Sequence, residues 1–312
     1  MPTNEPTPLN RRCPLVSIII PTHNRPEPLK QCLLSLVRLD ADRSLFEVIV
    51  IDDGSESNCQ DIVAENASGT HWSFLRQTNQ GPAAARNLGA NQAGGRFLAF
   101  LDDDCTLPRD WFQTLSPFLD EQTMLGGCTV NMLTKNIFST ASQELIEYLY
   151  TYYRTDSCQT QFVTSNNMVV PCLLFKDIGG FSTQFKGAAA EDREFCDRWL
   201  WSGYHIRSIQ QLRVEHWHSM NFYQFLKQHF GYGCGARLYH EMKRQRRGIG
   251  LTIEPPNFYK NLMMFPFSQH RGLRAFFLSL CLCLSQFCNA AGYFRAKTAG
   301  LLPSDQIGSD GK

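Results

Sequence analysis

The sequence predicts an α/β fold in which a mostly parallel sheet is flanked by helices. Three apolar runs of strand length support this prediction: 16–20 (VSIII), 46–51 (FEVIVI) and 97–101 (FLAFL). The run at 97–101 is uninterrupted, as expected for a strand that is covered on both faces. Segments with helical features separate the runs, so strands and helices alternate from residue 15 to residue 104. This alternation is typical of a doubly wound, Rossmann-like sheet.

Length and composition allow one large domain or two smaller ones. The 312 residues include 30 Lys and Arg against 29 Asp and Glu, so a net charge of +1 predicts no nucleic-acid partner. The 12 cysteines are scattered and no secretory signal is recognisable ahead of them, which predicts reduced thiols and a cytoplasmic protein. Cys281 and Cys283 lack a second pair at zinc spacing, so we expect no metal–thiolate site.

The first elements follow from local patterns. Residues 1–14 contain four prolines, which is typical of a flexible arm. After the strand at 16–20, Pro26 and Pro28 suit the first turn of a helix. The apolar residues of that helix recur at helical spacing and should face the sheet: Leu29, Cys32, Leu33, Leu36 and Val37.

The later elements are expected in the following order. We predict strands at 72–75, 124–130, 162–170 and near 214–216, and helices at 83–93, 110–119, 137–154, 191–204 and 219–240. Ser165, Asn166 and Asn167 in the strand at 162–170 suit either a hydroxyl-rich ligand or neighbouring backbone groups. We expect the helix at 219–240 to break between Gly231 and Gly235.

The clearest functional signal is the acidic triplet Asp102, Asp103 and Asp104, which directly follows the strand at 97–101. Ligands of open α/β sheets bind beyond the carboxyl ends of the strands. Neighbouring carboxylates repel one another unless a cation, a proton or water relieves the repulsion. The triplet is therefore either a ligand site or an acidic turn. Similarly, Arg86 at the start of an alanine-rich helix is either an anion ligand or a surface arginine.

Five motifs in series resemble family 2 glycosyltransferases with the GT-A fold, which are inverting enzymes of a bacterial type. The motifs are VSIIIPTHNRPEPLKQCLLSL, FEVIVIDDGS, GPAAARNLGA, RFLAFLDDDC and GGFSTQFKGAAAEDREFCDRWLWSGY. They cover residues 15–240, roughly three quarters of the chain. The resemblance implies a flexible arm at 1–14, a GT-A domain at 15–220 and a helical extension at 221–312.

The resemblance also implies a role for each matching residue. Nucleotide-sugar binding falls to Pro21, His23, Arg25, Asp53, Arg86, Asp102 and Asp103, with Asp53 accepting a hydrogen bond from the base and Asp102 or Asp103 near the ribose. Asp104 is the expected ligand of Mn²⁺ or Mg²⁺, and His216, or His218 as the second choice, completes the metal site. Asp192 is the expected general base and Glu191 orients the acceptor, although carboxylates also suit the start of any helix.

The implied function is metal-dependent, inverting transfer of one sugar from a nucleotide sugar to a glycan or lipid-linked acceptor in cell-surface glycan, glycolipid or polysaccharide assembly. Phe195 stands where processive synthases carry the glutamine of Gln-x-x-Arg-Trp, which favours a single transfer. A catalytically silent nucleotide-sugar or glycan-binding module is the alternative, but such a module needs no base at Asp192. A nucleotidyltransferase would need a glycine-rich basic loop, and PTHNRPEP is not one.

Two interpretations of the C-terminal segment remain open. Residues 275–288 are apolar, and Lys243, Arg244, Arg246 and Arg247 form a basic run before them. The apolar segment is shorter than the ~20 residues of a membrane-spanning helix. It either contacts the cytoplasmic face of the membrane peripherally or packs on its own domain.

Overall fold

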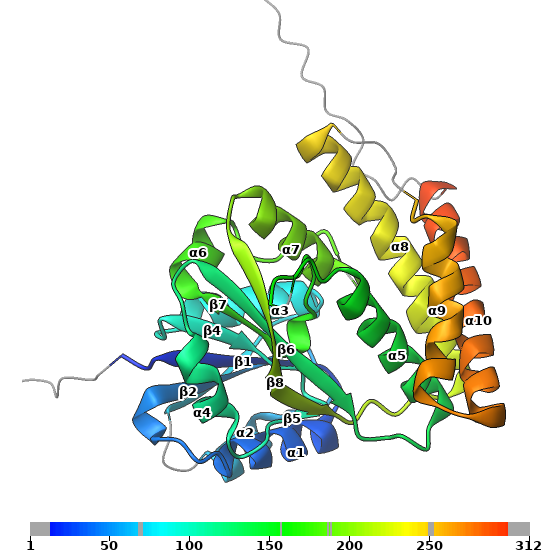
Figure 1. The fold of residues 1–312 in the computed structure, drawn as a ribbon. Coiled ribbons are helices and arrows are strands. Elements are labelled where there is room, and N and C mark those ends of the chain that lie inside the picture. Colours follow the sequence, from blue (N-terminus) through cyan, green and yellow to red (C-terminus); the bar gives the residue numbers. More distant parts are fainter. Residues whose placement is uncertain are drawn as a thin grey trace, which may run out of the picture.

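The computed structural model describes residues 13–67, 71–156, 158–185, 187, 189–248 and 253–298. A central sheet lies between two groups of helices, and a layer of long helices from the C-terminal part covers one side (Figure 1). The predicted arm at 1–14, apart from Cys13 and Pro14, lies outside the described residues.

Eight strands form one mixed sheet in the order β3-β2-β1-β4-β7-β6-β8-β5. The parallel half contains β1 (Val16–Thr22), β2 (Phe46–Asp52), β3 (His71–Arg76) and β4 (Phe97–Phe100). The other half contains β7 (Met168–Pro171), β6 (Thr123–Asn131), β8 (His205–His216) and β5 (Cys105–Thr106). There β7 is antiparallel to β4 and β6, β8 is parallel to β6, and β5 is antiparallel to β8.

Helices cover both faces of the sheet (Figure 1). One face packs on α1 (Pro26–Val37), α2 (Gln60–Asn66) and α4 (Trp111–Leu115), and the other on α3 (Pro82–Gln92), α6 (Cys172–Asp177) and α7 (Glu191–Trp201). Leu29, Leu33 and Leu36 are fully buried, as the helical spacing of α1 predicts.

The predicted strand at 162–170 is wrong in its first part. Ser165–Asn167 form a 3₁₀ turn, and only Met168–Pro171 belong to β7. The side-chain amide of Asn167 donates to the carbonyl oxygens of Cys128 (3.2 Å) and Leu212 (3.0 Å). This amide therefore ties β6 to β8 across the irregular pairing of these two strands, and such backbone bonding favours a turn over a regular strand.

The predicted break at Gly231–Gly235 is also wrong, because α8 (Phe222–Arg247) is continuous. A Cβ atom on Gly233 would lie 1.9 Å from the carbonyl oxygen of Asn289 in α10 (Gly272–Thr298). One on Gly292 would lie 2.0 Å from the carbonyl oxygen of Phe230 in α8. These glycines let the backbones of α8 and α10 touch, so they serve helix packing rather than a turn.

The helical layer consists of α5 (Ile137–Tyr152), α8, α9 (Pro256–Gln269) and α10. On α10, Ala275, Leu278 and Leu282 are fully buried. Gly272–Ala296 is the one described helix that is long and apolar enough to cross a membrane by length and composition.

The basic run on α8 mostly faces α7. Lys243, Arg246 and Arg247 lie within ion-pair distance of Asp197 at 3.8, 2.6 and 2.9 Å, and Arg246 also contacts the buried Glu194. Three of the four basic residues therefore hold α8 against α7, which is a structural role within the protein.

Candidate active site

A cavity of about 1740 Å³ opens at the carboxyl ends of β1 and β4 and extends to α5, α7, α8 and α10. It collects nine of the twelve predicted site residues: His23, Arg25, Arg86, Asp102, Asp104, Glu191, Asp192, His216 and His218. The other three, Pro21, Asp53 and Asp103, do not line the cavity and are buried.

Asp104 lies between two imidazoles. His216 at the end of β8 places Nε2 3.3 Å from Oδ1 of Asp104, and His218 places Nδ1 3.0 Å from Oδ2. The two rings stack with centroids 5.3 Å apart. Burial alone would raise the pKa of Asp104, but the hydrogen bonds with both histidines hold it well below its usual range. Asp104 is therefore ionised, and the two imidazoles that contact it come from residues far away in the sequence.

Arg25 relieves the repulsion within the triplet. Its Nη1 lies 2.9 Å from Oδ1 of Asp103 and 2.8 Å from Oδ2 of Asp104. Thr22 donates to the other oxygen of Asp103 at 2.7 Å. Burial raises the pKa of Asp103 to about 6 despite the opposing effect of Arg25, and the charge of Asp104 adds to the rise.

Arg86 connects three parts of the site. This guanidinium on α3 is only 3% exposed, which excludes the surface-arginine interpretation. It lies 2.6 Å from Oδ1 of Asp102 and 3.0 Å from Oε1 of Glu191 on α7. Both carboxylates thus share one buried cation, and Arg86 fixes the start of α7 relative to the triplet.

Asp192 is half-buried on the cavity wall next to Glu191. Burial, together with the negative charge of Glu191, raises the pKa of Asp192 to about 7. Its Oδ1 accepts a hydrogen bond from the backbone N–H of Arg193 at 2.7 Å. A carboxylate with such a pKa can gain and lose a proton near neutral pH.

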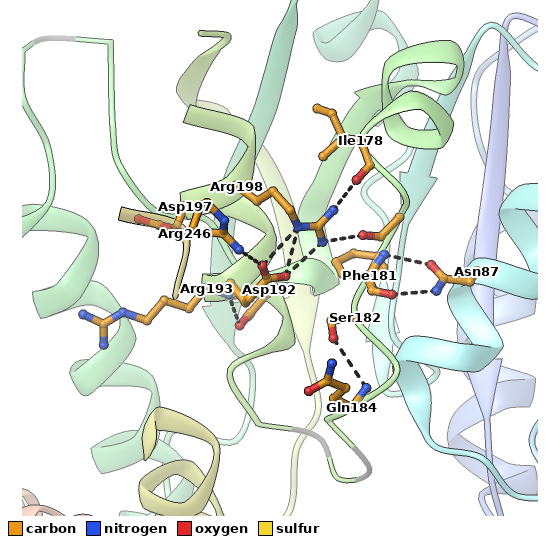
Figure 2. A network of polar contacts seen from close by, with 12 residues as sticks. Asn87, Ile178, Phe181, Ser182, Gln184, Asp192, Arg193, Asp197, Arg198 and Arg246 are labelled. Carbon is orange, nitrogen blue, oxygen red and sulfur yellow. Dashed lines mark hydrogen bonds and ion pairs between the residues drawn. The ribbon is translucent and has the colours of Figure 1, made fainter. Parts of the chain in front are cut away.

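A network of arginines holds the rest of α7 in place (Figure 2). Arg198 donates to the carbonyl oxygens of Ile178 (2.6 Å) and Gly180 (2.5 Å) and to Glu194 (2.9 Å). Arg246 from α8 approaches the same Glu194, whereas the side chain of Arg193 extends away from this network (Figure 2). The helix that carries Asp192 is therefore anchored on two sides.

Asp53 organises a loop instead of lining the cavity. Its Oδ1 accepts hydrogen bonds from Gln77 Nε2 (2.7 Å) and Gln80 N (2.8 Å), and Oδ2 accepts one from Gly81 N (2.8 Å). The amide of Asn79 in this loop lies 3.2 Å from Nε2 of His23. No sequence pattern marks Gln77 or Asn79 as a site residue, whereas Thr22 belongs to the PTHNR motif and could have been singled out.

Tyr232 on α8 is a site residue that the sequence did not indicate. It lines the cavity, and the pKa of its phenol is raised by burial and by the nearby Asp192, Glu191 and Asp102. Gln228, one turn earlier, donates to the Tyr232 hydroxyl, while the buried Oε1 of Gln228 has no hydrogen-bond partner. Helix α8 thus brings polar groups close to Asp102, which follows β4, and to Glu191 and Asp192 on α7.

The site can hold a divalent cation. The ligand atoms of Asp104, Cys105 and His216 lie within 4.8 Å of one another. Burial raises the pKa of the Cys105 thiol well above its usual value, so the thiol is protonated and unsuited to a hard cation. The donors of this group that suit a hard cation are Asp104 and His216, and His218 contacts the other oxygen of Asp104. Imidazole together with carboxylate suits Mn²⁺ better than Mg²⁺.

Residues 17–179 match the sequence model of glycosyl transferase family 2, just over half of the chain. Among curated relatives, Glycosyltransferase AglE of Haloferax volcanii is 35% identical over 102 residues, which are 32% of this chain and 34% of AglE. Poly(ribitol-phosphate) beta-N-acetylglucosaminyltransferase TarS of Staphylococcus aureus is 26% identical over 167 residues, 50% of this chain and 29% of TarS. The chain thus spans about a third of the length of these relatives.

Two solved structures share the fold over most of the chain. Mannosyltransferase PcManGT from Pyrobaculum calidifontis, in complex with GDP-Man and Mn²⁺, has a TM-score of 0.59 at 18% identity and covers 94% of this chain and 77% of its own. TarS 1–349 of S. aureus, in complex with UDP-GlcNAc, has a TM-score of 0.53 at 16% identity and covers 91% of this chain and 90% of its own. These likenesses confirm the predicted GT-A fold.

Proposed function

The chain belongs to glycosyl transferase family 2, and from this premise we propose that it is a metal-dependent, inverting enzyme that transfers one sugar per reaction. One observation supports this mechanism most directly. Asp192, whose pKa is raised to about 7, lies on the same cavity as the Asp104–His216–His218 cluster. The proposed general base and the candidate metal site thus line the same cavity.

The donor is a nucleotide sugar bound at the carboxyl ends of the parallel strands. Asp102 is half-exposed and available to the ribose, and Arg86 supplies positive charge near the diphosphate. We place the nucleobase near His23, which lines the cavity, beside the loop that Asp53 holds through the backbone N–H groups of Gln80 and Gly81. Relatives of this fold were solved with UDP-GlcNAc and GDP-Man, which supports this class of donor.

Asp104, His216 and His218 would hold a divalent cation, Mn²⁺ or Mg²⁺, which would supply positive charge for the diphosphate leaving group. Asp192 accepts the proton of the acceptor hydroxyl as that oxygen bonds to the anomeric carbon. The bond from the anomeric carbon to the diphosphate oxygen breaks on the opposite face, so the configuration inverts. Glu191, held by Arg86, orients the acceptor beside Asp192.

We place the enzyme in the cytoplasm at the inner face of the membrane, with a glycan or lipid-linked acceptor in cell-surface glycan, glycolipid or polysaccharide assembly. The supporting observation is an apolar stripe along α10 whose members are 55–76% exposed: Leu273, Phe276, Leu280, Phe287 and Phe294. These residues recur at helical spacing, so one side of α10 presents apolar surface along its length. A helix lying flat on the membrane fits this pattern, because the opposite side of α10 is packed on α5, α8 and α9.

The test concerns Asp104. Asp104→Asn keeps the size of the side chain but removes the charge that a cation requires, so Mn²⁺-dependent binding of UDP or GDP should be lost in calorimetry. Asp61→Asn on the exposed side of α2 is the control and should bind like the wild type. If Asp104→Asn binds the nucleotide with unchanged metal dependence, the assignment of the metal site is wrong.

A silent binding module is the competing function. It would bind the nucleotide sugar with the same metal dependence but show neither transfer nor donor hydrolysis. The raised pKa of Asp192 favours the enzyme, since a carboxylate poised near neutral pH serves proton transfer and is not needed for binding.

A further inference from the structure

A second polar group lines the cavity beyond Asp192. It consists of Arg193 on α7, Arg237 and His240 on α8, and Tyr293 on α10. Arg193 directly follows Asp192 in the chain, so the group begins beside the proposed base. None of the four takes part in the mechanism proposed above.

Arg237 forms no ion pair with any described residue. Its guanidinium lies over the ring of Tyr293 at 5.5 Å, and Nη1 is 3.3 Å from the Tyr293 hydroxyl. The buried Nε has no hydrogen-bond partner. Within the described part of the chain, no carboxylate oxygen lies within 4.0 Å of the Arg237 guanidinium, the distance that defines an ion pair. A partly buried cation of this kind is stabilised when a ligand supplies the missing negative charge.

The nearest acids are already engaged by other groups. Glu241, one turn after Arg237, pairs with Arg244. Glu254 forms an ion pair with Arg193 (3.9 Å) and accepts hydrogen bonds from the hydroxyls of Tyr152 (2.8 Å) and Tyr153 (2.7 Å). Neither carboxylate is therefore free to neutralise Arg237, and this end of the cavity keeps an excess of positive charge.

The neighbours of Arg237 add further donors. His240 places Nδ1 3.3 Å from the Tyr293 hydroxyl, and burial together with the charges of Arg193, Lys243 and Arg237 lowers the pKa of His240 to about 4. His240 is therefore neutral at pH 7. When its Nδ1 accepts the hydroxyl proton of Tyr293, its own proton resides on Nε2 and is available to a ligand.

Arg193 contributes a second cation nearby. Its guanidinium lies 5.2 Å from the ring centre of Tyr153 and 5.3 Å from that of Tyr239, while Glu254 is 3.9 Å away. These cation–π contacts, together with a hydrogen bond from Arg193 to the Tyr153 hydroxyl, hold the guanidinium between Asp192 and Arg237.

We propose that Arg237, assisted by His240, Tyr293 and Arg193, binds a phosphate group of the acceptor. This inference rests on the proposed function and names the acceptor class. A guanidinium fork with additional donors around it suits the several oxygens of a phosphate. The donor diphosphate is not the ligand of this group, because inversion places the diphosphate and the acceptor on opposite sides of the transferred sugar. A lipid-linked phosphate and a polyol phosphate share this chemistry.

The binding test uses decyl phosphate and decyl glucoside as probes, with the donor site filled by Mn²⁺ and the nucleoside diphosphate that the protein binds. Wild-type protein should bind decyl phosphate more tightly than decyl glucoside. Arg237→Ala should weaken decyl phosphate at least about tenfold, the loss expected for a charge-assisted hydrogen bond, and leave decyl glucoside unchanged. Arg237→Lys should give an intermediate loss, because it keeps the charge without the fork.

Arg38→Ala is the matched control, because it removes the same charge from an exposed position at the end of α1 that does not line the cavity. It should bind both probes like the wild type. Equal affinity of the wild type for both probes, or equal losses in Arg237→Ala and Arg38→Ala, would overturn the phosphate site. Arg237→Ala should retain donor hydrolysis, because that reaction does not use Arg237. If the wild type neither binds nor hydrolyses any nucleotide sugar, the proposed function, rather than the phosphate site, is wrong.

The source of the phosphate is identified by transfer assays. A sugar linked to decyl diphosphate represents the lipid-linked acceptor, and a short polyol phosphate oligomer represents the polymer. The true acceptor class should show a KM that rises at least about tenfold in Arg237→Ala with little change in kcat. If a phosphate-free glycoside is the better acceptor and its KM is insensitive to Arg237→Ala, the proposal is wrong.

Discussion

Replacement of Asp192 by asparagine tests the proposed mechanism most directly. A sugar hydroxyl is a poor nucleophile at neutral pH, and a positioned base contributes roughly 10² to 10⁴ in rate. Asp192→Asn should lower kcat by this factor. Arg86 keeps both of its carboxylate partners in the variant, and the Asp104 cluster is untouched. The affinity for the nucleoside diphosphate should therefore stay nearly the same.

The pH dependence of the wild type gives an independent measure of the same residue. With a pKa of about 7, Asp192 is roughly 9% deprotonated at pH 6 and 91% at pH 8. The base acts only when deprotonated, so kcat/KM should rise about tenfold between these values and then level off. Initial rates of nucleotide release at saturating metal measure this profile.

Glu191→Gln separates the two neighbouring acids. The negative charge of Glu191 raises the pKa of Asp192, so its removal should shift the rise of the pH profile to lower pH. The loss in kcat should be smaller than in Asp192→Asn, because Arg86 remains paired with Asp102. If Glu191→Gln is the inactive variant and Asp192→Asn is active, the base has been assigned to the wrong acid. Activity in both would refute an inverting mechanism that uses this pair.

Two further predictions concern the helical layer. Gly233→Ala should destabilise the protein by about 1 to 3 kcal/mol and lower its Tm, because the new Cβ would meet the Asn289 carbonyl oxygen. Gly231→Ala is the control: its new Cβ meets no atom within 4 Å, so this change should be neutral or stabilising. Replacing Phe276 and Phe287 by glutamine should reduce co-sedimentation with anionic vesicles. The Tm should not fall, because both side chains are exposed. Undiminished vesicle binding would argue against a membrane role for this side of α10.

The donor side of the site was predictable because its signals are local. An apolar strand that ends in carboxylates places those carboxylates at the edge of the sheet, and the structure shows this for Asp102 and Asp104. The choice between His216 and His218 could not be made from spacing. Both rings reach Asp104, because the end of β8 and the residues after it pass beside β5.

Contacts between distant segments were beyond the reach of sequence patterns. The pair of Arg86 and Glu191 joins positions 105 residues apart, and no local pattern distinguishes this arginine from a surface one. The glycines of α8 were misread for a related reason. Glycine lowers helix propensity locally, but the close packing of α8 on α10 offsets that cost and keeps the helix continuous.

The boundary of the family match explains why the donor can be inferred more readily than the acceptor. The match ends at residue 179, before Asp192, His216 and the whole of α8. Beyond that boundary α8 runs along α7: Gly235 lies against Ala189 just before the acidic pair, and Arg246, about three turns later on α8, contacts Glu194 in the first turn of α7. The position of the proposed base thus depends on the helical layer that also carries Arg237. Changes in this layer can alter acceptor choice while the strands that bind the nucleotide stay the same.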